Sequence, residues 1–173
     1  MIALMALLMT PPTMATDAAS VCRDGRTADQ AVSAVYDLVS VPAGGPWDWD
    51  RIGRLFVEDG LFVTMMPQPA GSQMTRANLT SLKSQTETTY RRSGFVEREY
   101  KRQSYIFRDI ASIYSSFYIA VPPDETRPLA RGLHHFQLVR TEGCWRIVSN
   151  IAQMEGSGWH LPTAFAPEKD AAR

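Results

Sequence analysis

Two adjacent histidines, His134 and His135, lie in a stretch whose alternating residues predict a β-strand over residues 131–140. Successive side chains of a strand point to opposite faces, so the two imidazoles cannot bind one metal ion together, and at most one can enter a pocket. His135 shares its face with Gln137. If that face is the concave one, His135 could exchange protons near neutral pH. The alternative is a hydrogen-bonded or solvent-facing histidine without a chemical role.

Acidic residues alternate along another predicted strand, residues 95–107. A carboxylate held in an aromatic-lined pocket would have a raised pKa and could abstract or donate a proton. Glu99 is the preferred candidate for this role. The alternative is a wet strand face with cross-strand ion pairs, for example between Glu97 and Arg131. Strict alternation places Glu97, Glu99, Lys101 and Gln103 on one face, opposite Arg98, Tyr100, Arg102 and Ser104.

Aromatic residues are numerous enough to line a pocket for a flat or apolar ligand, although most of them should belong to the core. Catalysis is therefore assigned to Glu99 and His135, and ligand contact to a larger set. That set is Tyr36, Trp49, Tyr100, Tyr118, Gln137 and Trp145.

An acidic and basic cluster near residue 50 has two interpretations. Asp48 and Asp50 could form a catalytic carboxylate pair, with Arg51 as an anion clamp. A structural role explains the same residues more simply, because Asp48 fits the N-cap of a helix and Asp50 then lies in the first turn, where the helix dipole favours negative charge. We expect the structural role.

The charge balance argues against binding to nucleic acid or to an anionic membrane. Eighteen basic and eighteen acidic residues cancel, and the sequence pI is about 6.8. The sequence has no nucleophile elbow, phosphate-binding glycine loop or dinucleotide fingerprint, and it predicts no metal or other cofactor. The expected partner is a small hydrophobic molecule.

Cys22 and Cys144 are the two cysteines of the chain, which excludes a CxxC redox pair and a cysteine-rich zinc site. In an oxidising compartment they could form a disulfide that closes a long loop. The alternative is a buried free cysteine at each position.

The first nine residues, Met1 to Met9, form an apolar run that is too short to span a membrane. With the small residues that follow, the run fits a secretory signal peptide over residues 1–19, although no Lys or Arg precedes it. We therefore expect a periplasmic or secreted protein without a stable membrane span after processing. The alternative is a frayed or anchoring N-terminal segment in a protein that is not exported.

Periodicity divides the remaining chain into a helical half and a strand half. An apolar stripe predicts a first helix from Ala28, and the Asp48 cap predicts a short second helix that ends by Gly60. A third helix is predicted from Met74 or Thr75 to Arg92. Strands are predicted over residues 61–66, 95–107, 110–121, 131–140 and 144–154, the last four forming an antiparallel meander.

Three amphipathic helices need a sheet face to cover, so the fold class is α+β: a curved, antiparallel, five-stranded sheet wrapped around three helices. The domain is expected to span residues 20–165, followed by a disordered tail over residues 166–173. The sequence segments at 42–45, 48–51, 94–99, 131–138 and 145–148 resemble bacterial nuclear transport factor 2-like (NTF2-like) proteins, often labelled SnoaL-like.

This resemblance implies a cone-shaped, cystatin-like domain with a pocket between helices and sheet, commonly dimeric through sheet surfaces. Such folds host lyases, isomerases and cyclases as well as non-catalytic binders, so the fold does not choose a reaction. Two hypotheses follow. The chain is an exported protein that binds a small apolar or aromatic ligand, or it is a cofactor-free lyase, isomerase or cyclase that uses a pocket carboxylate or histidine.

Overall fold

A computed structural model describes residues 22–156 and 158–167 of the chain. The expected signal peptide lies outside these residues, as does most of the expected tail. Ala166, the first residue assigned to that tail, is buried, and its backbone N–H bonds the carbonyl of Pro162. The packed structure thus extends slightly past the predicted domain boundary.

Each described helix begins at a side-chain cap. Helix α2 (Ala28–Val39) follows Thr27, whose hydroxyl accepts the N–H of Gln30 at 3.1 Å. Helix α3 (Trp49–Arg54) follows Asp48, which accepts the N–H of Arg51 at 2.9 Å, as the capping interpretation predicted. Helix α4 (Leu79–Tyr90) starts at a capping box formed by Asn78 and Ser81.

Six strands form one curved sheet in the order β2-β1-β6-β5-β4-β3. All neighbouring pairs are antiparallel except β1 and β6, which are parallel. The strands are β1 (Phe56–Gln68), β2 (Gly71–Ala77), β3 (Val96–Phe107), β4 (Ile110–Ala120), β5 (Ala130–Thr141) and β6 (Cys144–Met154).

The α+β class is confirmed, but the prediction of five antiparallel strands is wrong. The additional strand, β2, occupies the segment that was assigned to the start of the third helix, and the hairpin closes where Gln68 pairs with Gly71. Gly71 has φ of +133°, a conformation that glycine adopts readily. Most of β2 is exposed, so it lacks the apolar alternation that reveals a half-buried strand.

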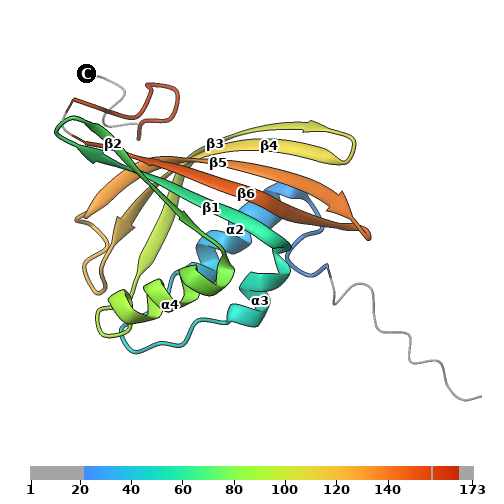
Figure 1. The fold of residues 1–173 in the computed structure, drawn as a ribbon, viewed down its shortest axis with the longest axis horizontal. Helices are drawn as coiled ribbons and strands as arrows, with labels where there is room; N and C mark the ends of the chain where they lie inside the picture. Colours follow the sequence, from blue (N-terminus) through green and yellow to red (C-terminus); the bar gives the residue numbers. More distant parts are fainter. Residues whose placement is uncertain (1–21, 157, 168–173) are drawn as a thin grey trace, which may run out of the picture.

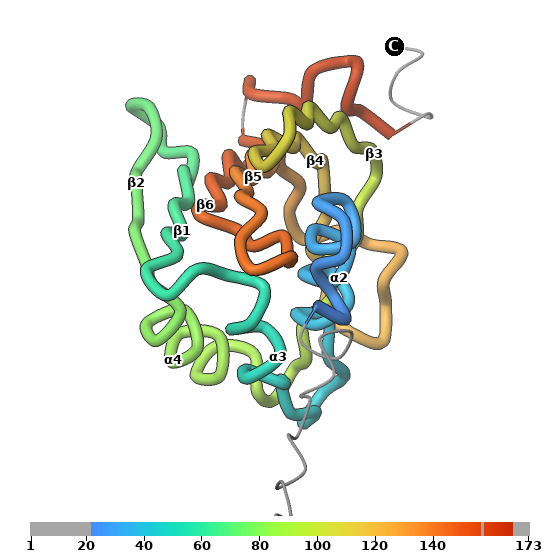
Figure 2. The backbone as a smooth tube through the Cα atoms, turned by 90° about the vertical axis from the view of Figure 1, so that its right-hand side faces the viewer, coloured from blue at the N-terminus to red at the C-terminus, as the bar shows by residue number. Residues whose placement is uncertain are grey.

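The sheet curls around α2, while α3 and α4 lie at one end of it (Figures 1 and 2). Residues from α2 and from the inner face of the sheet share one core, which includes Val32, Ile113, Phe117 and Phe136. Within the described residues, no helix is long and apolar enough to cross a membrane. We call the face toward α2 the inner face and the opposite one the outer face.

A β-bulge in β3 reverses the predicted alternation of its side chains. Glu99 pairs with Phe117 and Lys101 pairs with Ser116, so Tyr100 is the extra residue. An inserted residue shifts the following side chains to the other face. Arg102 consequently joins Glu99 on the inner face, where the sequence placed the two on opposite faces.

Candidate functional site

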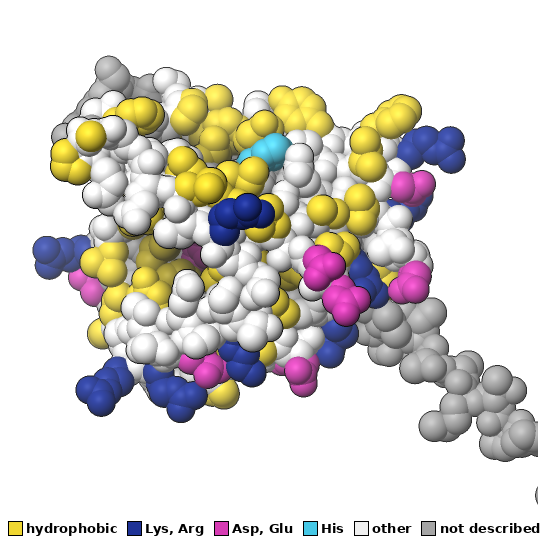
Figure 3. Space-filling model, viewed as in Figure 1, with side chains coloured by type: hydrophobic (Ala, Val, Ile, Leu, Met, Phe, Trp, Pro, Cys, Tyr) yellow, Lys and Arg dark blue, Asp and Glu magenta, His cyan; other side chains and the backbone are white. Residues whose placement is uncertain are grey.

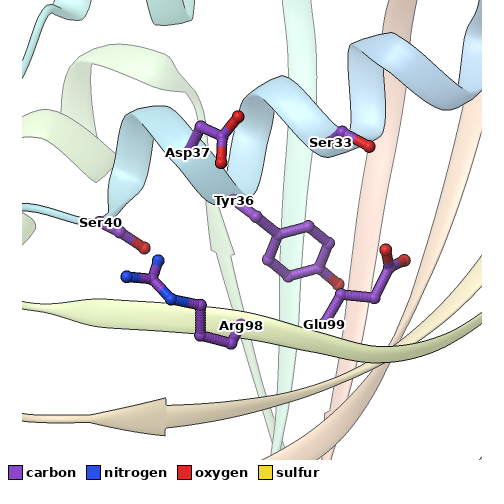
Figure 4. A pocket seen from close by; sticks show the side chains of 6 residues that line it. All are labelled: Ser33, Tyr36, Asp37, Ser40, Arg98 and Glu99. Atoms are coloured by element: carbon purple, nitrogen blue, oxygen red, sulfur yellow. The ribbon is translucent and has the colours of Figure 1, made fainter. Parts of the chain in front are cut away.

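An open cleft of about 390 Å³ lies between α2 and the edge strand β3 (Figure 4). Its lining is mostly polar, and its residues come from the exposed side and end of α2 and from the middle of β3. They are Ser33, Tyr36, Asp37, Ser40, Arg98 and Glu99. Of the two predicted catalytic residues, Glu99 therefore belongs to this cleft.

A short hydrogen-bonded chain runs from the cleft into the core. The hydroxyl of Tyr36 lies 2.6 Å from Oγ of Ser115, which in turn donates to the carboxylate of Glu99. Ser115 is fully buried on β4. The chain therefore links helix α2, strand β4 and strand β3 through three polar side chains, and its two ends both line the cleft.

Arg102 fixes the orientation of Glu99. Its Nε and Nη2 atoms donate to the two oxygens of the carboxylate, each at 2.8 Å, a bidentate pairing of high geometric specificity. The same guanidinium donates to the backbone carbonyl of Asp29 at 2.6 Å. Arg102 thus ties Glu99 to the first turn of α2.

A second carboxylate lies deeper on the inner face. Glu97 is 8% exposed, and its Oε1 lies 2.7 Å from Nε2 of His134, which is 6% exposed. The imidazole stacks on Phe117, with ring centroids 4.0 Å apart, and meets Tyr36 edge-on at 6.1 Å. The suggested ion pair of Glu97 with Arg131 does not form, because Arg131 pairs with Glu155.

The electrostatics of the cleft keep Tyr36 neutral. Burial raises the pKa of Tyr36 well above its ordinary value of 10.0, and the negative charges of Glu97 and Glu99 raise it further. A neutral phenol that keeps its proton can donate a hydrogen bond at any physiological pH. Because Ser115 gives its own proton to Glu99, the hydroxyl of Tyr36 is the donor in the bond to Ser115.

His135 and Gln137 lie outside this site, on the outer face. The inner face of β5 carries His134 and Phe136. The face with His135 and Gln137 is therefore not the concave one, and His135 cannot act in the inner pocket. His135 instead lies 2.7 Å from Ser112 and stacks on Tyr114. Gln137 is exposed and accepts a hydrogen bond from Ser149 at 2.8 Å.

The predicted aromatic contacts divide among three places. Tyr36 lines the cleft, and Tyr100 packs against Tyr118 with centroids 5.0 Å apart. Trp145 is buried in the core, and Trp49 donates its indole N–H to Glu87 of α4 at 2.8 Å. Of these aromatic residues, the structure brings only Tyr36 together with Glu99.

Cys22 and Cys144 form a disulfide that joins the segment before α2 to the start of β6. Beside it, Arg51 donates two hydrogen bonds of 2.6 Å to Asp24. Arg51 thus anchors the segment before α2, which fits the structural role of the cluster near residue 50. In the described part of the chain, no group of three His, Cys, Asp or Glu residues could hold a metal ion.

Solved structures share this arrangement of helices and sheet. A proposed dehydratase of the NTF2-like family from Streptomyces avermitilis is 12% identical, with a TM-score of 0.55 over 78% of this chain and 98% of that chain. The chain has the NTF2-like fold. An NTF2-like protein with a cystatin-like fold from Novosphingobium aromaticivorans is 16% identical, with a TM-score of 0.50 over 64% of this chain and 71% of that chain.

A third neighbour in shape is a proposed aromatic ring hydroxylase, also from Novosphingobium aromaticivorans. It is 16% identical, with a TM-score of 0.52 over 78% of this chain and 94% of that chain. No protein-family model and no curated protein sequence matches the chain. At these identities the likeness concerns the fold, and the reaction has to be argued from the site.

The sequence analysis missed both residues that hold the carboxylate of Glu99, Ser115 and Arg102, as well as the cleft-lining Ser33, Asp37, Ser40 and Arg98. Ser115 lies in a strand rich in β-branched and aromatic residues. A single small hydroxyl in such a strand gives no sign in the sequence that it belongs to a site. Arg102 was assigned to the wrong face, because no residue in the segment marks the bulge at Tyr100. Glu99 was found, since a carboxylate on a strand beside aromatic residues is visible in the sequence.

Proposed function

We propose that the cleft binds a small polar molecule and moves a proton on it without a cofactor, as a lyase or an isomerase does. The observation that carries this proposal is Glu99: a cleft-lining carboxylate joined through Ser115 to the neutral hydroxyl of Tyr36. A base beside a hydrogen-bond donor, here the guanidinium of Arg98, is the pairing needed to remove a proton next to a carbonyl and to stabilise the resulting oxyanion.

Each group then has a separate role. Glu99 accepts the proton, and Arg102 and Ser115 hold its carboxylate in position. Tyr36 keeps its proton and donates it in a hydrogen bond to Ser115, which steadies the chain that holds Glu99, and Arg98 at the rim donates to the developing oxyanion. Three hydrogen bonds fix the direction of the Glu99 carboxylate, and the expected substrate carries its proton next to a carbonyl, as in a β-hydroxyketone that loses water.

The polar lining supports this class of substrate over a purely apolar ligand, and one structural neighbour is itself described as a dehydratase. Arg98, at the rim of the cleft, would meet an anionic or carbonyl group on the substrate. Its ion pair with Glu125 is long, at 3.4 Å, and both side chains are largely exposed. A substrate group could therefore replace Glu125 at small cost.

A proton-exchange experiment tests this function. Small β-hydroxyketones and their enones are screened by thermal shift, and the compounds that bind are incubated in D₂O while NMR follows deuterium at the carbon next to the carbonyl. The wild type should accelerate the exchange, and Glu99→Gln should lower the rate by about 100-fold or more. Lys83→Gln, on the exposed face of α4, is the matched control. Equal rates for Glu99→Gln and the wild type would exclude Glu99 as the base.

The second candidate is a non-catalytic protein that binds a small apolar or aromatic ligand. The open shape of the cleft favours it, because an enclosed site would exclude water better during proton transfer. A compound that stabilises the wild type and Glu99→Gln equally, with no exchange, would support this second candidate.

We also propose that the protein is exported and acts in the periplasm or outside the cell. The disulfide between Cys22 and Cys144 supports an oxidising compartment, and the apolar run at residues 1–9 fits a signal peptide. The protein is isolated from the medium and from the fractions of its source cells, and mass spectrometry identifies its mature N-terminus. An intact Met1 on a protein recovered with the cytosolic fraction would refute the proposal.

A further inference from the structure

A second polar cluster lies on the outer face of the sheet, separated from the cleft by the sheet itself. Ser112 of β4 directly opposes Gln137 of β5, and Tyr114 opposes His135 two residues along. Side chains of directly opposed residues stand on the same face, with Cβ atoms about 5 Å apart. Ser112, His135 and Gln137 therefore form one compact group, which the proposed function does not use.

Ser112 and His135 have the geometry of a nucleophile and its base. Oγ of Ser112 lies 2.7 Å from Nε2 of His135. The imidazole stacks on Tyr114 with a centroid distance of 4.4 Å and an interplanar angle of 4°, which fixes the plane of the ring. Burial lowers the pKa of His135, so the imidazole is neutral at pH 7 and can accept the hydroxyl proton.

Gln137 is positioned to donate a hydrogen bond beside Ser112. Its Oε1 accepts from Ser149 at 2.8 Å, and Ser149 is buried, so this end of the amide is held in place. The Nε2 group of the same amide is then turned away from Ser149. A side-chain amide next to a nucleophile can stabilise the oxyanion that forms on a substrate carbonyl.

An apolar groove of about 760 Å³ begins at this cluster and runs toward the β3–β4 hairpin; we call it the outer groove. Tyr105, Phe107 and Ile110 are 59%, 73% and 59% exposed along it. Figure 3 shows hydrophobic side chains along the upper edge of the molecule, where this hairpin runs. The outer groove is lined by Ser104, Tyr105, Ile106, Phe107, Ile110, Ala111, Ser112, Gln137, Leu138, Val139 and Val148.

We propose that Ser112 is a nucleophile activated by His135, and that the outer groove binds the acyl chain of a small apolar ester. Oγ of Ser112 forms a bond to the ester carbonyl carbon while His135 accepts the hydroxyl proton. The carbon–oxygen bond to the alcohol then breaks, and the proton passes from His135 to the leaving alkoxide. Water, deprotonated by His135, cleaves the acyl-serine and restores both residues. Gln137 donates to the carbonyl oxygen in both steps.

Covalent labelling tests this proposal without knowledge of the natural ester. The full-length protein is treated with an alkyl fluorophosphonate, which reacts with activated serines, and the modified residue is identified by peptide mass spectrometry. We expect labelling of Ser112 and none of Ser84, an exposed serine on α4. His135→Gln should lower the labelling rate by about 100-fold. An unlabelled Ser112, or equal labelling in His135→Gln, would overturn the proposal.

Ester hydrolysis gives a second, independent measurement. The wild type should hydrolyse p-nitrophenyl butyrate, and Ser112→Ala, which removes one oxygen atom and keeps the strand, should abolish the reaction while Ser84→Ala retains it. Hydrolysis that persists in Ser112→Ala would refute the role of Ser112, even if His135→Gln fails to fold. Lys83→Gln should label and hydrolyse like the wild type, and Ser112→Ala should keep the deuterium exchange of the inner cleft, so failure at the outer groove is distinguishable from failure of the inner cleft.

Discussion

The hydroxyl of Tyr36 lies 2.6 Å from Oγ of Ser115, although 79 residues separate them in the chain. This contact joins the middle of α2 to the buried centre of β4. Because Ser115 also donates to Glu99, the position of the helix and the orientation of the cleft carboxylate depend on the same hydrogen-bonded chain. A substitution at Tyr36 should therefore change both the stability of the fold and the chemistry of the cleft.

Tyr36→Phe should lower the free energy of unfolding by about 1 kcal/mol at pH 8, because one buried hydrogen bond is lost and the packing of the ring is kept. The raised pKa of Tyr36 adds a pH effect. Above pH 10 the unfolded chain releases this proton while the folded chain keeps it, so the wild type loses stability as the pH rises.

Urea unfolding at pH 8 and at pH 10.5 measures both effects. The difference between the wild type and Tyr36→Phe should be smaller at pH 10.5, because the phenylalanine side chain carries no proton to release. An equal difference at the two pH values would contradict a raised pKa for Tyr36.

Arg102→Met should destabilise the protein by about 3 kcal/mol, because it leaves Glu99 on the inner face without its ionic partner. Arg102→Lys should cost less, since it keeps the charge and loses the bidentate geometry. A double-mutant cycle with Glu99→Gln gives the coupling energy between the two side chains, expected at about 1 kcal/mol or more. If the double variant is destabilised by the sum of the two single destabilisations, the two side chains are not coupled.

Asp24→Asn should lower stability by about 1 kcal/mol at pH 7, since it removes the carboxylate that Arg51 binds with two hydrogen bonds. Those bonds and the charge of Arg51 lower the pKa of Asp24 below its ordinary value. The stabilisation is present above pH 4 and is lost as the pH falls through the lowered pKa, so the difference between the wild type and the variant should shrink as the pH falls below 4. Thermal unfolding between pH 2.5 and pH 7 checks this, with Asp59→Asn as an exposed control.

Removal of the disulfide should lower stability by about 4 to 5 kcal/mol, because Cys22 and Cys144 are 122 residues apart and their link restricts a large loop of the unfolded chain. The double substitution Cys22→Ser with Cys144→Ser is compared with the wild type, with and without a reducing agent. The reducing agent should lower the stability of the wild type and leave the variant unchanged. A wild type that is insensitive to reduction and as stable as the variant would show that the bond contributes nothing.

The sequence was sufficient for the main elements of the inner core. The apolar stripe of α2 and its Thr27 cap predicted the helix, and alternation predicted strands β3 to β6; β4, β5 and β6 each have a face that packs on the core. Strand β2 escaped prediction because it lies at the exposed edge of the sheet. The parallel pairing of β1 with β6 joins segments far apart in the chain, and no local pattern encodes it.

The residue types of the candidate sites were visible in the sequence, but their partners were decided by the tertiary structure. The sequence identified Glu99 and His135 as candidates for proton transfer to a ligand, and it determined that His134 and His135 face opposite sides. The bulge at Tyr100 decided that Arg102 would hold Glu99, and the curvature of the sheet decided that His134 faces α2 while His135 faces outward. The reason is physical: a strand alternates by local geometry, whereas a bulge and the curvature of a sheet result from how all the strands pack together.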